Sequence, residues 1–182
     1  MALLLMAVTW LPRIAAAGGL PSPVTATPFD ASHQGDVASI DFLIKQARSY
    51  VIGLQFEYDG RTDQRRVLEL VGVGAGTPKA PGIPIEIEFK LWRLDSADHQ
   101  PRLLLADRVT TKGSYAQAFG WTRFKGRFQR IIATINLKPG SYRVEARTLA
   151  DNPAFVGTPT SLVIDYYADL QFVPHSLSPT NN

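Results

Sequence analysis

Alternation of apolar and polar residues with a period of two is the dominant pattern along this chain. Because successive side chains of a strand point to opposite faces, each such run predicts a strand with one buried face. The clearest run is Tyr50-Ile52-Leu54-Phe56-Tyr58. Further runs cover 37–44, 83–91, 103–110, 128–137, 142–146 and 161–167. The pattern therefore predicts about seven strands, with Arg48-Ser49 turning between the first two as a hairpin.

One stretch has helical spacing instead. In "RTDQRRVLELVG", Val67, Leu68 and Val71 form an apolar stripe at helical spacing. Asp63 is a plausible N-cap, and Gly72 can close the helix. The sequence predicts a short helix of two to three turns at this point.

These elements predict an all-β fold, an antiparallel immunoglobulin-like β-sandwich of about seven strands with one short helical insertion. The chain has 182 residues, 45% of them hydrophobic, which suits one domain with its own core. We assign the sandwich to residues 29–173. The Pro- and Gly-rich stretch 18–28 predicts a linker, and the unpatterned residues 174–182 predict a flexible tail.

The N-terminus has the features of a secretory signal peptide. An apolar run from Ala2 to Leu11 precedes Ala15-Ala16-Ala17, a small-residue cleavage pattern. No Lys or Arg precedes the run, and a buried N-terminal strand or helix is the alternative. The run is about half the roughly 20 residues needed to span a bilayer. We expect residues 1–17 to be removed, no transmembrane segment to remain, and the protein to be periplasmic or secreted.

The chain contains no cysteine, which limits its chemistry. Disulfides, a cysteine nucleophile, thiolate metal sites and a lipid anchor on an N-terminal Cys are all excluded.

Other catalytic and metal-binding patterns are weak. Asp95, Asp98 and His99 in "DSADH" could bind a metal, but the same residues suit a turn. Glu86 and Glu88 share the outward face of one strand, where polar residues are ordinary. No G-x-S-x-G motif marks a nucleophilic serine. We expect no catalytic residue, no metal ligand, no cofactor and no enzymatic activity.

The segment "GWTRFKGRFQR" from Gly120 to Arg130 is the strongest candidate for a binding site. The formal net charge of the chain is only +3, so four cations in eleven residues are a local feature. Basic groups neutralise phosphates and aromatic rings stack on bases or sugars, so the segment could bind a polyanion. The candidate residues are Trp121, Arg123, Phe124, Lys125, Arg127 and Arg130. The alternative is a solvated loop whose aromatics cover the end of the sandwich.

The alternation places part of this segment on a strand. It predicts a loop that leads into a strand from Phe128, with Phe128, Arg130 and Ile132 facing outward. The core-facing set would then be Ile131, Ala133 and Ile135.

Several stretches together resemble an uncharacterised family of exported proteobacterial proteins, a domain of unknown function. They are "PFD", "SYVIGLQFEY", "RRVLELVGVG", "PGIPIEIEFKLWRLD", "GSYAQAFGW" and "RIIATINLKPGSYRVEARTLADNPAFVGTPTSLVIDY". The resemblance covers roughly residues 28 to 167. It implies an exported β-sandwich and transfers no activity and no functional residue.

The expected function is therefore a non-catalytic exported binding protein with an unknown protein partner, for instance an immunity-type protein that neutralises a toxin. The first alternative is binding of an envelope polyanion (lipopolysaccharide, glycan or nucleic acid) through the basic and aromatic loop at 121–130. The second alternative is a carbohydrate-active enzyme whose site is built from distant strands.

Overall fold

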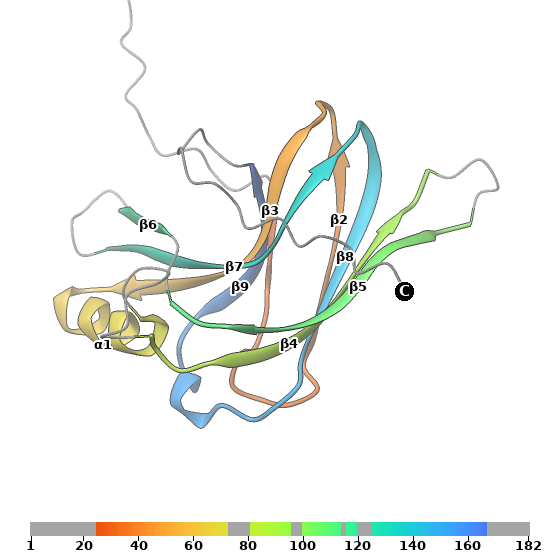
Figure 1. Cartoon of the computed structure of the whole chain (residues 1–182). Coiled ribbons are helices and arrows are strands. Elements are labelled where there is room, and N and C mark those ends of the chain that lie inside the picture. The colour runs from red at the N-terminus through yellow and green to blue at the C-terminus, as the bar shows by residue number, and fades with distance from the viewer. Residues whose placement is uncertain (1–24, 73–80, 96–99, 114–115, 120–124, 167–182) are drawn as a thin grey trace, which may run out of the picture.

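The structure is a computed structural model that describes residues 25–72, 81–95, 100–113, 116–119 and 125–166. Its strands form two antiparallel sheets, a five-stranded sheet in the order β1-β9-β3-β7-β6 and a four-stranded sheet in the order β2-β8-β4-β5 (Figure 1). The elements are β1 (Thr25–Pro28), β2 (Val37–Ile44), β3 (Arg48–Asp59), α1 (Arg61–Val71), β4 (Ile85–Arg93), β5 (Arg102–Thr111), β6 (Ala116–Phe119), β7 (Lys125–Leu137), β8 (Gly140–Thr148), the 3₁₀ turn η1 (Pro153–Phe155) and β9 (Thr160–Tyr166). The predicted all-β sandwich is confirmed.

The structure differs from the predicted elements in two short strands that the sequence did not predict, β1 and β6, and in the partners of the strands. Thr25–Pro28, placed in the linker by the sequence, forms β1 and pairs with β9. The predicted β2–β3 hairpin is wrong, because β2 pairs with β8 whereas β3 pairs with β7 and β9. Alternation fixes the buried face of a strand but carries no information about which strand lies beside it.

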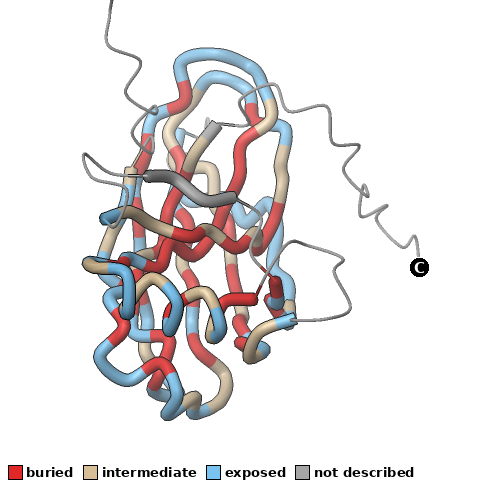
Figure 2. Tube along the Cα trace, turned by 90° about the vertical axis from the view of Figure 1, so that its left-hand side faces the viewer, coloured by how far each residue is buried: buried red, intermediate tan, exposed pale blue. Residues whose placement is uncertain are grey.

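The inward faces of the two sheets form the core. Ile85, Ile87, Phe89 and Leu91 of β4 are all at most 1% exposed, and the other strands contribute in the same alternating way. Buried residues accordingly run along the strands of both sheets (Figure 2). Fully burying a side chain of this size stabilises the fold by about 1.5–3 kcal/mol relative to leaving it in water.

Helix α1 lies at one end of the sandwich (Figure 1). Val67 and Val71 are fully buried there, as the apolar stripe predicted. Asp63 lies in the first turn rather than at the N-cap, which is Gly60, and its carboxylate accepts a hydrogen bond from the N–H of Asp59. Gly72 closes the helix as predicted, with its N–H 2.7 Å from the carbonyl of Leu68. No helix in the described part of the chain is long and apolar enough to cross a membrane.

Strand β7 contains a β-bulge that reverses its faces. Ala133 lies opposite Ile52, but Ile131 lies opposite Gly53, so Ile132 is an extra residue on β7. The core-facing positions Ala133 and Ile135 were predicted correctly. Up to the bulge the faces are exchanged: Phe128, Arg130 and Ile132 are 1%, 0% and 6% exposed, and their predicted outward orientation is wrong. Ile131, predicted to face the core, is only half-buried. A one-residue insertion moves every following side chain to the other face.

Gly53 permits the bulge because it has no side chain. A Cβ atom at this position would lie 2.5 Å from the carbonyl oxygen of Arg130 on β7. The two strands approach each other more closely there than any residue with a side chain would allow.

We expect Gly53→Ala to lower the free energy of unfolding by about 1–3 kcal/mol, because the added methyl group must push the two backbones apart. Urea denaturation measures the change. Ser39→Ala, on an outward face, is the control and should change stability by less than about 0.5 kcal/mol. Equal stabilities for the two variants would contradict the close approach of β3 and β7.

Candidate functional site

Arg130 is a buried cation whose five N–H groups all donate to main-chain carbonyls. Its Nε atom lies 3.1 Å from the oxygen of Val71. Its Nη1 atom contacts the oxygens of Ile83 at 2.8 Å and Thr111 at 3.2 Å. Its Nη2 atom contacts those of Leu70 at 2.9 Å and Val71 at 2.7 Å. A guanidinium has five N–H donors, so none is left for a ligand.

Within the described residues, the surroundings of Arg130 compensate its charge through main-chain carbonyls, with no hydrogen-bonded carboxylate. Leu70 and Val71 are the last residues of α1, where carbonyls lack helical partners and the helix dipole favours a cation. The rings of Phe56 and Phe155 lie 5.6 and 5.8 Å from the guanidinium carbon. Burial lowers the pKa of Arg130 to about 10, which leaves the group protonated at pH 7. The assignment of Arg130 to a polyanion-binding surface is therefore wrong.

The rest of the predicted patch is only partly described. Lys125 pairs with Asp59 at 2.9 Å, and Arg127 lies opposite Glu57 of β3. Trp121, Arg123 and Phe124 lie outside the described residues. Within the described segments, the patch is thus reduced to two cations, each across from an acidic residue.

We expect Arg130→Lys to lower the free energy of unfolding by about 3 kcal/mol or more, because an ammonium group cannot reproduce the five hydrogen bonds and leaves buried carbonyls unpaired. Chemical denaturation measures the loss. Arg108→Lys is the matched control: Arg108 is 74% exposed, and its replacement should cost less than about 0.5 kcal/mol. A stable Arg130→Lys protein would contradict this account of the site.

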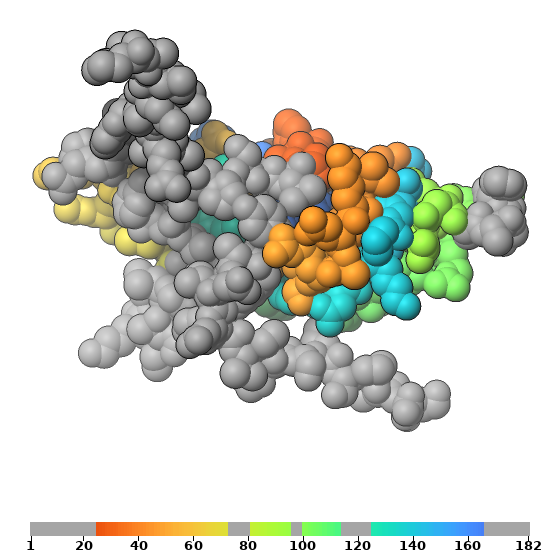
Figure 3. All heavy atoms as spheres, turned by 90° about the horizontal axis from the view of Figure 1, so that it is seen from above, coloured from red at the N-terminus to blue at the C-terminus, as the bar shows by residue number. Residues whose placement is uncertain are grey.

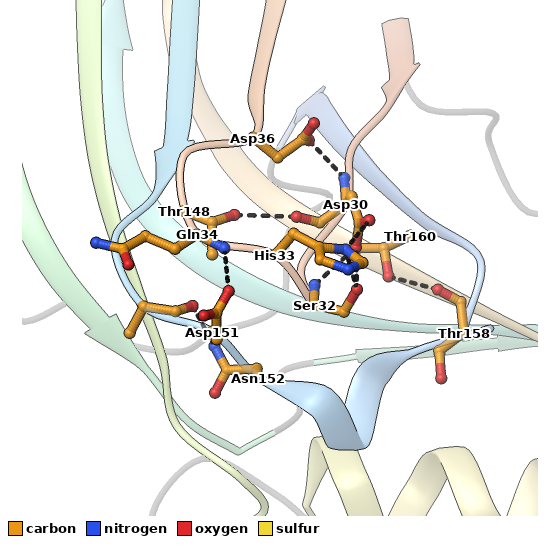
Figure 4. Close-up of polar contacts among 11 residues, drawn as sticks. Asp30, Ser32, His33, Gln34, Asp36, Thr148, Asp151, Asn152, Thr158 and Thr160 are labelled. Atoms are coloured by element: carbon orange, nitrogen blue, oxygen red, sulfur yellow. Dashed lines mark hydrogen bonds and ion pairs between the residues drawn. The ribbon is translucent and has the colours of Figure 1, made fainter.

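A second polar cluster, in the loop between β1 and β2, was not predicted from the sequence. Asp30, Ser32 and His33 point toward one another (Figure 4). One oxygen of Asp30 accepts hydrogen bonds from the N–H and hydroxyl of Ser32, at 2.7 and 2.6 Å. The other lies 2.7 Å from Nδ1 of His33. A search for a catalytic triad expects serine, histidine and aspartate to lie far apart in the sequence. Asp30, Ser32 and His33 are near neighbours, so that search does not find them.

This cluster has the composition of a hydrolase triad but not its geometry. In a triad the histidine uses one ring nitrogen for the serine and the other for the carboxylate. Here Nδ1 of His33 lies near both the Ser32 hydroxyl, at 2.9 Å, and Asp30. The Ser32 hydroxyl donates to the carboxylate, and Ser32 is only 4% exposed. The arrangement is that of a turn in which an aspartate accepts hydrogen bonds from the residues that follow it.

Further hydrogen bonds join this loop to the end of β8 and to the segment after it. The N–H of Gln34 donates to the carboxylate of Asp151 at 2.7 Å, and the hydroxyl of Thr148 donates to the carbonyl of Asp30 at 3.0 Å. The polar groups therefore stabilise a corner of the sandwich.

The charges of this corner predict a pH dependence. The hydrogen bond from Ser32 lowers the pKa of Asp30, and the hydrogen bond to Asp30 raises the pKa of His33 above 6.5. The stabilisation from His33 is fully present below pH 6.5 and is lost as the pH rises through its raised pKa. That from Asp30 is present above pH 3.8 and is lost as the pH falls through its lowered pKa.

An NMR titration of the His33 ring should show the raised pKa. Asp30→Asn should return the pKa of His33 toward 6.5, whereas Asp41→Asn, on β2, should leave it unchanged. A His33 pKa that is the same with and without the Asp30 carboxylate would show that the pair does not form.

The most unusual surface feature is a run of exposed leucines on β5, the edge strand of the four-stranded sheet. Leu103, Leu104 and Leu105 are 51%, 39% and 37% exposed. We call these three residues the leucine surface. The β4–β5 hairpin that carries it projects from one side of the molecule (Figures 1 and 3). Three consecutive exposed leucines differ from the scattered apolar residues that any protein surface carries.

A second β-bulge, opposite Leu91 and Trp92, shapes this surface. Leu105 lies opposite Leu91 and Leu103 opposite Trp92, so Leu104 is an extra residue on β5. The bulge places Leu103 beside Trp92 on the outer face, whereas Leu105 lies opposite the buried Leu91, on the inward face. Exposed apolar side chains gathered on one edge strand are typical of a docking surface.

Two of the acidic residues considered for catalysis or metal binding, Glu88 and Asp95, lie in ion pairs. Glu88 contacts Arg108 at 3.3 Å and Lys90 at 3.8 Å. Asp95 pairs with Arg93 at 2.8 Å, whereas Asp98 and His99 lie outside the described residues. In the described ranges no group of three or more His, Cys, Asp or Glu residues could hold a metal ion.

Comparison with solved structures supports the fold. The crystal structure of GEBA250068378 from Sulfurospirillum deleyianum superposes with a TM-score of 0.67 at 20% sequence identity, covering 81% of this chain and 98% of that one. A family GH115 4-O-methyl-alpha-glucuronidase, BtGH115A, with specificity for decorated arabinogalactans, gives a TM-score of 0.38 at 8% identity and covers 81% of this chain but 18% of its own. The second likeness is too weak to support an inference.

Comparison by sequence identifies the family. No curated protein matches the chain. Residues 26–166 match the family described as Domain of unknown function (DUF5625). Since the match spans more than half of the sequence, the chain belongs to the DUF5625 family.

Proposed function

We propose that this chain is a non-catalytic binding protein that engages a protein partner through the leucine surface. The observation that carries the proposal is the exposure of three consecutive leucines, Leu103, Leu104 and Leu105, on one edge strand. Fully burying one such side chain contributes about 1.5–3 kcal/mol, so three of them can anchor a partner. The export signal expected at residues 1–17, a periplasmic or secreted location and the immunoglobulin-like class of the sandwich remain parts of this proposal.

In this proposal the leucines contact the partner through their side chains, and the backbone of β5 does not pair with a strand of the partner. A bulge at Leu104 interrupts the regular edge, and bulges protect edge strands from pairing. Asp107 lies opposite Phe89, on the inward face of the sheet, and is exposed. An inward-pointing charge is a second device that discourages an added strand.

Binding of a polyanion is the weaker alternative. With Arg130 buried, that alternative depends on Trp121, Arg123 and Phe124, together with Lys125 and Arg127 at the start of β7.

A photo-crosslinking amino acid at position 104, introduced into the chain in its native host, tests the proposal. We expect one predominant protein adduct. Its purified partner should bind the wild-type chain and bind Leu103→Lys at least about tenfold more weakly, because the substitution places a charge in an apolar contact. Leu43→Lys, with a leucine of similar exposure on β2, is the control and should bind as wild type. Equal loss or no loss in both variants would contradict a role for the leucine surface.

A further inference from the structure

The opposite edge of the four-stranded sheet, strand β2, lacks the protection seen on β5. Val37–Ile44 alternates strictly between exposed and buried positions over eight residues. It contains no proline and no inward-pointing charge, and its pairing with β8 has no bulge. In the described part of the chain, β8 is the strand that it pairs with in its sheet. A long, regular edge of this kind is a template for pairing with another strand.

The unpaired backbone groups of β2 can be assigned from the hydrogen bond at its start. The N–H of Thr148 donates to the carbonyl of Asp36 at 3.0 Å, so Val37 and Arg147 form a non-hydrogen-bonded pair. The N–H and C=O groups of Val37 therefore point away from β8. By alternation, Ser39, Asp41 and Leu43 also direct theirs to the free edge.

The side chains of these same four residues face outward, and two of them are large and apolar. Val37 is 43% exposed and Leu43 is 57% exposed. Asp41 holds Arg143 of β8 at 2.6 Å, which compensates its charge. The β2–β3 region, orange, lies at the surface beside β8, cyan, in the view from above (Figure 3).

We propose that β2 pairs in antiparallel fashion with β2 of a second copy of this chain, with the two-fold axis at Ile40. In this register Val37 lies opposite Leu43 of the second copy, so the two exposed apolar side chains of each strand cover each other. Ser39 lies opposite Asp41 of the second copy, where its hydroxyl can donate to the carboxylate. The two four-stranded sheets then form one continuous sheet.

Symmetry and charge select this register over its neighbours. A two-fold axis perpendicular to the sheet keeps each side chain on the same face, so residues that lie opposite each other are an even number of positions apart. The residue midway between them therefore lies opposite its own copy. An axis at Asp41 sets two carboxylates opposite each other, which is destabilising. An axis at Ser39 sets Val37 opposite Asp41. The axis at Ile40 avoids both and keeps the buried residues Ala38 and Phe42 opposite each other on the inward face.

On β5, several axes of self-pairing set like charges opposite each other. An axis at Leu105 sets Arg102 opposite Arg108 of the second copy, and axes at Asp107 and Arg108 set like charges opposite each other. Both edges of the sheet thus have exposed leucines, but β2 has the regular edge that suits self-pairing, whereas a bulge interrupts β5. The proposed dimer edge is separate from the leucine surface, and it goes beyond the proposed function.

Sedimentation velocity over a range of concentrations up to about 0.5 mM tests the dimer. We expect the wild-type chain to show a concentration-dependent monomer–dimer equilibrium. Leu43→Lys should weaken the dimer at least about tenfold, because it sets an ammonium group against Val37. Ser39→Pro should weaken it similarly, because it removes an outward N–H while leaving the pairing with β8 intact.

Leu103→Lys is the matched control and should dimerise as wild type. Circular dichroism and thermal unfolding verify that the variants are folded. A wild-type chain that stays monomeric throughout the range, or a dimer unaffected by Leu43→Lys, would overturn the proposal. The two tests are independent. Absence of partner binding through β5 would not affect dimerisation through β2, and absence of dimerisation would not affect partner binding.

The register is tested by disulfide crosslinking, since the chain has no cysteine of its own. In a hydrogen-bonded antiparallel pair the Cα atoms are about 5.5 Å apart, a distance that a disulfide can bridge. A mixture of the Val37→Cys and Leu43→Cys chains should form crosslinked dimers under mild oxidation, whereas neither chain alone should. Crosslinking by either variant alone, or none in the mixture, would overturn the register.

Discussion

The guanidinium of Arg130 joins four segments that are distant in sequence: the end of α1, the approach to β4, the end of β5, and β7 itself. A planar group with five donors can satisfy several backbone carbonyls at once, whereas an apolar side chain of similar volume would leave them unpaired. The helix is held against the sandwich by this contact as well as by the burial of Val67 and Val71. The packing at this end of the domain therefore depends on one charge kept out of water.

Gly53 makes that burial possible. Its missing side chain admits the carbonyl of Arg130, the bulge at Ile132 follows, and the bulge turns Arg130 inward. A cation that would otherwise face solvent on a regular strand becomes the centre of a hydrogen-bonded cluster. The second bulge, at Leu104, acts in the opposite direction and leaves leucines on the surface. In both strands one additional residue determines which side chains face the solvent.

The two edges of the four-stranded sheet consequently have different properties. β5 is interrupted and charged, and presents side chains, whereas β2 is regular and presents backbone groups. A partner protein on β5 and a second copy on β2 could bind together, because the two edges are separated by β8 and β4. The polar corner at Asp30 and His33 stabilises the connection between β1 and β2.

The sequence by itself determined seven of the strands, the helix and the all-β class, because alternation and helical spacing are local properties of neighbouring residues. The short strands β1 and β6 emerged only in the structure. The family was also recognisable from its segments. Only the tertiary structure decided strand partners and the orientation of Phe128 and Arg130, because a bulge depends on the residue across the ladder. Gly53 lies 77 positions from Arg130 in the chain, and nothing local to either residue indicates that their backbones meet.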